Sequence, residues 1–277
     1  MQKAKGSKAS GWPSVITALV VTTIVAFPIY WMVVTSLKDS KELLAAIPTL
    51  FPKESHLENY VEVLQTSDMP LYFRNTALMT VGIVALQLTT CTLAAYGFAV
   101  GRSRGKRFLF GLVLCAMMLP QQVTFIPIYI AFAQLRLVNT FFALIVPEAT
   151  STFSIYLIYT AFNSVNRDLV DIGRSDGLSR LQMIWYVYLP TCSPVFITSV
   201  ILSFINSWNS YFWPRIIAND RAHRVISVGL NFLKRTTISG DAIANYNVVM
   251  AGAFLSILPV LILFIVFQKH IVKNKFV

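Results

Sequence analysis

Long, mostly apolar stretches alternate along this chain with short charged segments. Six stretches carry at most one charged residue, at 9–37, 75–101, 108–135, 137–166, 181–214 and 242–268. A helix rises about 1.5 Å per residue, so about 20 residues cross about 30 Å of hydrocarbon, and each stretch is long enough. The pattern predicts six transmembrane helices with cores at 14–36, 76–99, 108–131, 140–162, 194–214 and 248–268.

The apolar character within these stretches is continuous and does not alternate as in the strands of a membrane barrel, so the expected fold class is all-α. Lys3, Lys5 and Lys8 precede the first stretch, as in a signal peptide, but the stretch is too long for one and no clear cleavage site follows. The connecting segments are too short for a separate soluble domain. We therefore expect one transmembrane domain over residues 1–277, with short helices near 57–64 and 222–236.

Composition supports a membrane protein. Hydrophobic residues make up 56% and charged residues 13%, with a mean hydropathy of +0.64, whereas soluble domains are about 45–50% apolar and about 25% charged. This excludes a disordered chain, a coiled coil and a small disulfide scaffold. The net charge of +11 comes from basic residues between the apolar stretches, not along one helix face, so a nucleic-acid partner is not expected.

The basic residues also predict the orientation. With the N-terminus inside, 13 lysines and arginines fall on cytoplasmic segments and 10 on outer ones. The short segment GRSRGKR at 101–107 favours cytoplasmic N- and C-termini, whereas the basic segment 215–246 counts against them.

No catalytic or metal-binding motif is present in the sequence. It lacks G-x-S-x-G, H-E-x-x-H and D-x-D-x-D-G, and its three cysteines and three histidines have no metal-ligand spacing. We expect Cys91, Cys115 and Cys192 to be free buried thiols. The segment 101–107 is one residue too short for a phosphate-binding loop and lacks its final Ser or Thr, so this chain is not expected to hydrolyse ATP.

Several polar groups lie within the apolar stretches. Glu148 is the one acid well inside such a stretch, which suggests a proton relay or a contact with a polar solute. A carboxylate near the outer face, reaching water or a neighbouring helix, is the alternative. The other candidates for a translocation pathway are Gln121, Gln122, Asn206, Trp208 and Asn209. Hydrogen bonding between helices explains them equally well.

The polar connection at 164–190 has the pattern of two short amphipathic helices. Apolar residues recur at Val165, Leu169 and Ile172, Gly177 follows as a helix stop, and a second apolar series contains Leu178, Leu181, Trp185 and Tyr188. Such a hairpin either docks on a cytoplasmic partner or lies on the membrane surface.

The spacing within this connection resembles the conserved loop of binding-protein-dependent ABC importer permeases, in which E-A-A, three residues, Gly, nine residues and I-x-L-P follow one another. Here Asp171-Ile172-Gly173, three residues, Gly177, nine residues and Val187-Tyr188-Leu189-Pro190 keep every interval. The residue types differ in part, since Asp replaces Glu and Ile-Gly replaces Ala-Ala. The segments LENYVEVL, FRNTALMT, AAYGFAVGRSRGKR, LPQQVTFIPIYI, LVNTFFALIVP and SWNSYFWP resemble the maltose-G-type carbohydrate permeases.

The resemblance implies a type I importer permease in a bacterial or archaeal cytoplasmic membrane. Its implied partners are a second homologous permease, two copies of a cytoplasmic ATPase that bind ATP and Mg, and an extracytoplasmic solute-binding protein; no cofactor is implied for this chain. By this resemblance the connection at 164–190 is a cytoplasmic coupling loop. Its implied ATPase contact is formed by Leu169, Asp171, Ile172, Gly173, Arg174, Asp176 and Gly177.

Two other function classes remain open at this point. A self-sufficient proton- or ion-coupled carrier would use Glu148, although such carriers usually pair several intramembrane charges. A membrane enzyme acting on lipid would need a catalytic pair at the interface, and none is recognisable in the sequence.

Overall fold

The computed structural model describes residues 11–273 apart from 46, 67, 102 and 239–245. Lys3, Lys5, Lys8, Arg102 and Lys275, which entered the orientation prediction, lie outside the described residues. The described chain is helical without a strand, so the predicted all-α class is confirmed. It divides into two compact units, one of residues 1–68 and 230–257, the other of residues 69–229 and 258–277.

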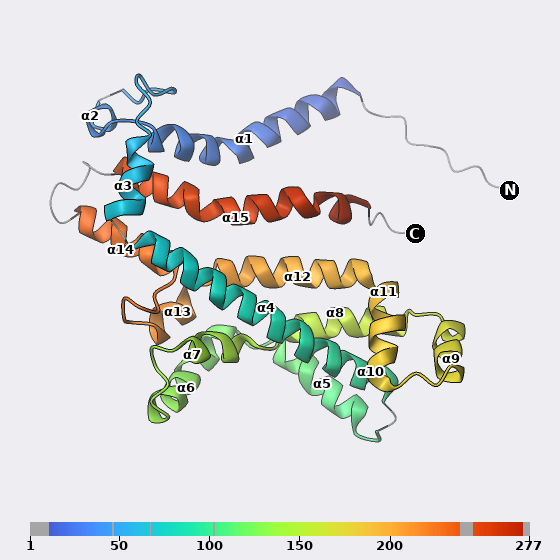
Figure 1. Cartoon of the computed structure of the whole chain (residues 1–277). Helices are drawn as coiled ribbons and strands as arrows, with labels where there is room; N and C mark the ends of the chain where they lie inside the picture. The colour runs from blue at the N-terminus through green and yellow to red at the C-terminus, as the bar shows by residue number, and fades with distance from the viewer. Residues whose placement is uncertain (1–10, 46, 67, 102, 239–245, 274–277) are drawn as a thin grey trace. The chain divides into compact units, whose positions relative to one another are not determined.

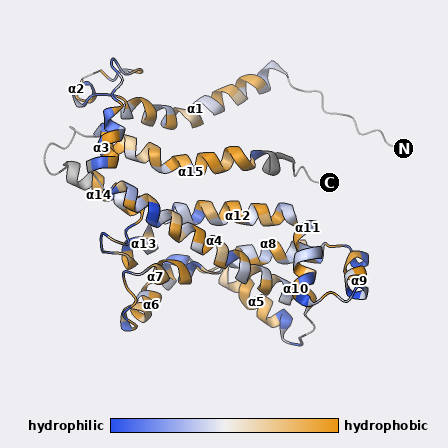
Figure 2. Ribbon diagram, in the orientation of Figure 1, coloured by the Kyte–Doolittle hydropathy of each residue, from blue (hydrophilic) through white to orange (hydrophobic). Residues whose placement is uncertain are grey.

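The first unit contains α1 (Trp12–Ser36), α2 (Ser40–Leu43), α3 (Glu58–Thr66), the end of α14 (Ile226–Ile238) and the start of α15 (Tyr246–Lys273). The apolar surface of α1 is exposed in the chain, as expected for a helix that faces lipid or another subunit. Figure 2 shows mainly hydrophobic colouring along α1 and α15.

Buried polar groups join the elements of this first unit. Asn59 donates through Nδ2 to the carbonyl oxygens of Ser36 and Lys38, and Asn247 donates to Lys38 and to Asn59 Oδ1. In the exposed segment that follows α2, His56 pairs with Glu58 at 2.7 Å, and this hydrogen bond raises the pKa of His56.

The second unit is built around the long helix α4 (Met69–Val100), which packs against α8 (Thr152–Asn163) and α12 (Ser193–Trp208) (Figure 1). Its remaining elements are α5 (Lys106–Ala116), α6 (Gln121–Gln134), α7 (Phe141–Ile145), η1 (Val146–Glu148), α9 (Arg167–Ser175), α10 (Arg180–Met183), η2 (Ile184–Tyr188), α11 (Leu189–Thr191), α13 (Phe212–Ile217) and parts of α14 and α15.

Two apolar clusters stabilise this unit. One lies near Cys91 and Ala95 of α4 and includes Ile158, Phe162 and Phe196. The other lies near Met79 and Ile83 of α4 and includes Leu144, Trp213, Ile217, Val225 and Val228. Cys91 and Cys192 are buried free thiols as expected, but Cys115 is exposed on α5, so that part of the prediction was wrong. Mean apolarity of a stretch does not say which helix face packs inward.

Three of the predicted spans are continuous helices and three are broken. Trp12–Ser36, Met69–Val100 and Tyr246–Gln268 are each long and apolar enough to cross a membrane. The other three are helix pairs bent by 100° between α5 and α6, 45° between α7–η1 and α8, and 89° between α10–α11 and α12. The described chain thus has three candidate spans, or up to six if each bent pair is one span.

Prolines lie at all three bends. Pro120 precedes α6, Pro147 lies in η1, and Pro190 and Pro194 flank the third bend. Proline lacks a backbone N–H and its ring clashes with the preceding helical turn, which explains why continuous apolar stretches become broken helices. The fifth predicted span also ends early, at Trp208, because Asn209, Ser210 and Tyr211 separate α12 from α13.

Candidate functional site: the coupling hairpin and an intramembrane polar cluster

The segment 164–190 forms a helical hairpin with defined ends. Asn166 caps α9, accepting a hydrogen bond from the backbone N–H of Asp168 at 3.0 Å. At the other end Gly177 has a φ of +72°, and Leu178 N donates to Gly173 O at 3.1 Å while Gly177 N donates to Arg174 O at 3.0 Å. These two bonds form a Schellman motif, which favours glycine because of the positive φ. The predicted helix stop at Gly177 is confirmed.

Gly173 is where α9 lies closest to the second arm. It is buried, and a Cβ at this position would lie 2.8 Å from Met183 Sδ and 3.2 Å from Val187 Cγ2. The first contact is too close for a Cβ and the second is tighter than most Cβ contacts, so the absence of a side chain at Gly173 lets the two arms approach this closely.

Exposed apolar and charged side chains lie on α9. Leu169 is 45% exposed and Ile172 is 57% exposed. Asp171 Oδ1 lies 3.3 Å from Arg174 Nη1, one helical turn away, and both side chains are exposed. Asp176, also exposed, is the C-cap residue of α9. At 100° per residue, Leu169, Ile172 and Asp176 share one side of α9, whereas Asp171 and Arg174 lie on the other side, so the helix offers both apolar and charged side chains to a partner.

Part of the predicted apolar pattern on the hairpin was wrong. Val165 precedes α9 and is buried in the apolar cluster around Phe162, so it does not share a face with Leu169. On the second arm Tyr188 is buried while Leu181 and Trp185 are exposed. The cause is the π-helix η2, whose wider turn rotates the residues after Met183 away from the positions that an α-helix would give them.

A polar cluster links two of the helix bends inside the predicted spans. Gln121, the first residue of α6, donates through Nε2 to Glu148 Oε1 at 2.6 Å. Gln87 of α4 donates to the backbone carbonyl of Glu148 at 3.0 Å, and Ser203 of α12 donates to Gln87 Oε1. The intramembrane polar cluster, defined as Gln87, Gln121, Glu148 and Ser203, therefore connects α4, α6, η1 and α12.

Side chains of α4 also bind the backbone at the second bend. Thr90 Oγ1 donates to Ala149 O at 2.6 Å, and Cys91 Sγ contacts Ser151 N at 3.4 Å and Ser151 O at 3.5 Å. Non-helical backbone at membrane depth is tolerated where protein groups satisfy it, and α4 provides these groups.

The structure brings together only some of the predicted pathway residues. Gln121 and Glu148 are in contact, and Gln122 is exposed beside Gln121. Asn206 and Asn209 are exposed near the end of α12, where Asn209 donates to Ile205 O at 2.9 Å. Trp208 is buried and stacks on Phe204, so its ring faces the protein interior. Sequence reasoning missed Gln87 and Ser203, although Gln87 is the one Gln in the uncharged stretch 75–101.

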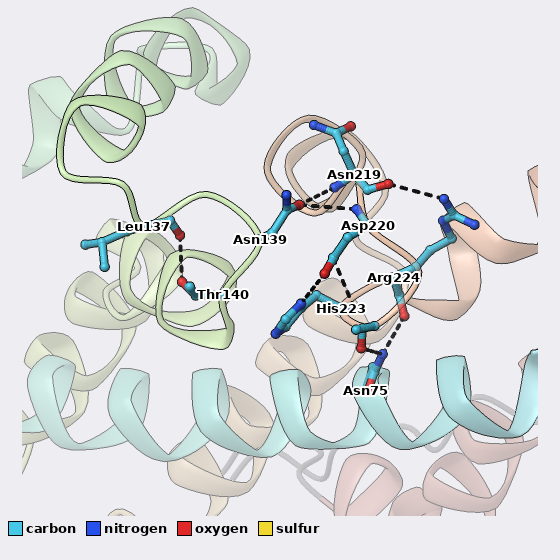
Figure 3. A network of polar contacts seen from close by, with 9 residues as sticks. Asn75, Leu137, Asn139, Thr140, Asn219, Asp220, His223 and Arg224 are labelled. Atoms are coloured by element: carbon cyan, nitrogen blue, oxygen red, sulfur yellow. Dashed lines mark hydrogen bonds and ion pairs between the residues drawn. The ribbon is translucent and has the colours of Figure 1, made fainter.

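A second polar network joins the turn before α7 to the turn between α13 and α14 (Figure 3). Asn139 Oδ1 accepts from the backbone N–H groups of Asn219 at 2.7 Å and Asp220 at 3.2 Å, and Asp220 Oδ2 pairs with His223 Nδ1 at 2.8 Å. Asn75 of α4 donates to the carbonyl oxygens of Ala222 and Arg224. Asn139 has a φ of +60°, which Asn tolerates better than most residues.

Within the part of the chain that the structure describes, no three His, Cys, Asp or Glu side chains lie together as a metal site.

Comparison with known proteins identifies the family. Residues 87–276 match the family described as binding-protein-dependent transport system inner membrane component. The chain belongs to this family. Its members are non-catalytic permease subunits of ABC importers, and the family gives no support to a self-sufficient carrier.

Relatives align over most of the chain. It is 28% identical over 275 residues to the arabinooligosaccharides transport system permease protein AraQ of Halalkalibacterium halodurans, covering 98% of this chain and 97% of that protein. It is 31% identical over 253 residues to the probable ABC transporter permease protein YurM of Bacillus subtilis, covering 90% and 82%. A crystal structure of a bacterial ABC transporter involved in importing the acidic polysaccharide alginate contains a chain with the same fold, with a TM-score of 0.83 at 23% identity, covering 97% of this chain and 99% of that one.

Proposed function

We propose that this permease subunit serves an importer of a sugar, oligosaccharide or polyol, and that its hairpin at 164–190 transmits the ATPase cycle to the membrane spans. AraQ, which aligns along nearly the whole chain, is named for arabinooligosaccharide transport. One observation carries the coupling role: α9 presents exposed apolar and charged side chains while Gly173 and Gly177 hold the helix against the second arm.

The partners in this proposal are a second homologous permease, two copies of a cytoplasmic ATPase that bind ATP and Mg, and an extracytoplasmic solute-binding protein. Residues 1–277 form one transmembrane permease domain. Both termini and the hairpin face the cytoplasm of a bacterial or archaeal cell, because the ATPase must reach α9 from there. The turn at 217–224 is then extracytoplasmic, one span away from the hairpin.

Within the hairpin we assign the ATPase contact to the exposed side chains of α9, Leu169, Asp171, Ile172 and Arg174, and of its C-cap residue Asp176. The Asp171–Arg174 pair is exposed and contributes little to stability, because exposed ion pairs are typically worth about 0–1 kcal/mol. Both side chains therefore exchange this contact for one with the ATPase at small cost. Gly173 and Gly177 act as positioning residues that set the angle of α9.

The translocation pathway in this proposal passes the intramembrane polar cluster, with Gln121 and Glu148 at its surface and Gln122, Asn206 and Asn209 as further polar positions. Trp208 is assigned a packing role beside the pathway, because its ring is buried against Phe204.

The test is co-purification of the importer from native membranes in mild detergent, followed by mass spectrometry and ATPase assays. Gly177→Asp places a side chain on a residue with a φ of +72° and is expected to weaken ATPase recovery by about tenfold or more while the second permease is retained. Gly105→Asp is the matched control, because Gly105 lies in an exposed turn, has an ordinary φ of −82° and leaves open space for a Cβ.

Full ATPase recovery and binding-protein-stimulated hydrolysis in Gly177→Asp would contradict the coupling role. Recovery of the wild-type chain without any ATPase would contradict the importer itself.

A further inference from the structure

We propose that Glu148 and Gln121 form a solute contact that admits uncharged, hydroxyl-rich carbohydrates and excludes anionic ones. The inference rests on the proposed function, because it names the solute class of the pathway described above. It adds what the relatives leave open, since they include a permease named for arabinooligosaccharides and a fold neighbour from an importer of an acidic polysaccharide.

The position of Gln121 and Glu148 suits a solute contact. Gln121 is exposed and Glu148 is half-buried, and both lie where broken helices replace a continuous span. A carboxyl group and an amide at such a depth face a polar cavity or protein, because lipid exposure of a carboxylate is costly. Bends of two broken helices meet at this pair, and discontinuous helices mark the solute sites of many membrane transporters.

Buried hydrogen bonds hold the backbone of Glu148 in place. The backbone of Glu148 is bound from the protein side by Gln87, which is 9% exposed, and Gln87 in turn accepts from Ser203, which is 4% exposed. The buried half of the cluster thus fixes the backbone position of Glu148. A binding group held in place loses little conformational entropy when it binds a solute.

Gln121 and Glu148, the exposed half of the cluster, offer both hydrogen-bond donors and acceptors. A carboxylate accepts hydrogen bonds, and an amide both donates and accepts them. Sugar hydroxyl groups do both as well, so the pair is complementary to a diol. Hydrogen bonds to charged groups are worth about 1.5–3 kcal/mol, which is enough to discriminate between solutes.

The charge of Glu148 discriminates between neutral and anionic solutes. No ion pair joins a lysine or arginine among the described residues to Glu148. The side-chain amide of Gln121, the first residue of α6, already donates to the Glu148 carboxyl group. A uronate or sugar phosphate at this point would meet a like charge without a counter-charge, in surroundings where such repulsion is strong.

The experiment uses the whole importer, with both permeases, the ATPase and the binding protein, in proteoliposomes. The probes are radiolabelled neutral trisaccharides of arabinose, xylose and glucose, and trimers of galacturonate and glucuronate. Uptake per ATP hydrolysed is compared for the wild type, Glu148→Gln and the matched control Glu62→Gln, which removes the same charge from an exposed position outside the cluster. The amide introduced by Glu148→Gln still accepts from Gln121, so a purely structural role of the bond is preserved.

We expect the wild type and Glu62→Gln to import a neutral trisaccharide and to import the uronates at least about tenfold more slowly. Glu148→Gln should raise the KM for the neutral solute several-fold and reduce the discrimination against uronates by about tenfold, as expected from the loss of one charged hydrogen bond and one repulsion.

Efficient uronate import by the wild type would overturn the inference. So would an unchanged ratio of neutral to anionic uptake in Glu148→Gln, since selection would then lie in the binding protein or the second permease. ATP-driven uptake of neither class would instead contradict the proposed carbohydrate importer.

Discussion

Single residues decide how closely the helices of this permease approach. Gly173 is buried where a methyl group would collide with Met183 and Val187, and a Cβ at Gly82 on α4 would lie 2.7 Å from Ile145 Cδ1. Substitutions at such positions overpack the interface and typically cost about 1–3 kcal/mol. Gly173 therefore sets the hairpin angle, and Gly82 sets the distance between α4 and α7.

Gln87 is the residue on which the buried half of the intramembrane cluster depends. Gln87→Leu leaves the Glu148 carbonyl without its side-chain donor and Ser203 Oγ without its acceptor, and unsatisfied buried groups cost about 1–3 kcal/mol each. We expect a loss of that size in the free energy of unfolding, measured by denaturant titration of the purified chain in detergent. Gln122→Leu, at an exposed position, is the control and should leave stability nearly unchanged; equal stability of the two variants would contradict the assigned contacts.

At the scale of elements, the sequence was informative about which stretches are helical and less so about where they bend. The apolar runs located the three continuous candidate spans and the three bent helix pairs, because uninterrupted hydrophobicity over about 20 residues is typical of helices that cross a bilayer. The sharp bends at Pro120, Pro147 and Pro190 could not be told from the sequence, because proline also occurs inside continuous helices, as Pro28 does in α1 and Pro259 in α15. Tertiary contacts distinguish the bend between η1 and α8, because side chains from α4 bind its exposed backbone.

In the candidate sites, too, the local features could be predicted from the sequence and the long-range contacts could not. The helix stop at Gly177 followed from local spacing, because a Schellman motif is formed by neighbouring residues alone. The contact between Gln121 and Glu148 joins residues far apart in the chain, and the partnership of Gln87 with Ser203 spans an even longer separation. These residues meet only because α4 packs against α12, and the periodicity of the sequence does not predict that packing.

The turn before α7 is held to the turn after α13 mainly by one side chain. Asn139→Gly keeps the positive φ but removes the oxygen that accepts from Asn219 and Asp220, so we expect the free energy of unfolding to fall by about 1–2 kcal/mol. Asn139→Asp keeps an acceptor at the same place and should retain most of the stability. Thermal unfolding in nanodiscs compares the two, and a smaller loss in Asn139→Gly than in Asn139→Asp would show that these hydrogen bonds contribute little.

For the whole molecule, the central expectation concerns sidedness. The hairpin and the turn at 217–224 lie at opposite ends of α12 and must open to opposite sides of the membrane if α10–α12 form one span. A cysteine introduced by Asn219→Cys should react with an impermeant maleimide in intact cells, whereas Ser175→Cys should react only after permeabilisation. Cys115 is replaced beforehand because it is exposed. Labelling of both positions from one side would contradict the proposed topology.

The hydrogen bonds from α4 to the bend between η1 and α8 affect how fast this bend can open. Residues 148–151 have no continuous helix of their own, yet Gln87, Thr90 and Cys91 bind them from one uninterrupted helix. Local opening of this bend requires separation from α4, so its backbone amides should exchange with deuterated solvent as slowly as those of the helices around it. The irregular backbone at 148–151 would thus exchange its amide hydrogens slowly. During each turnover α4, η1 and α8 would move as one body.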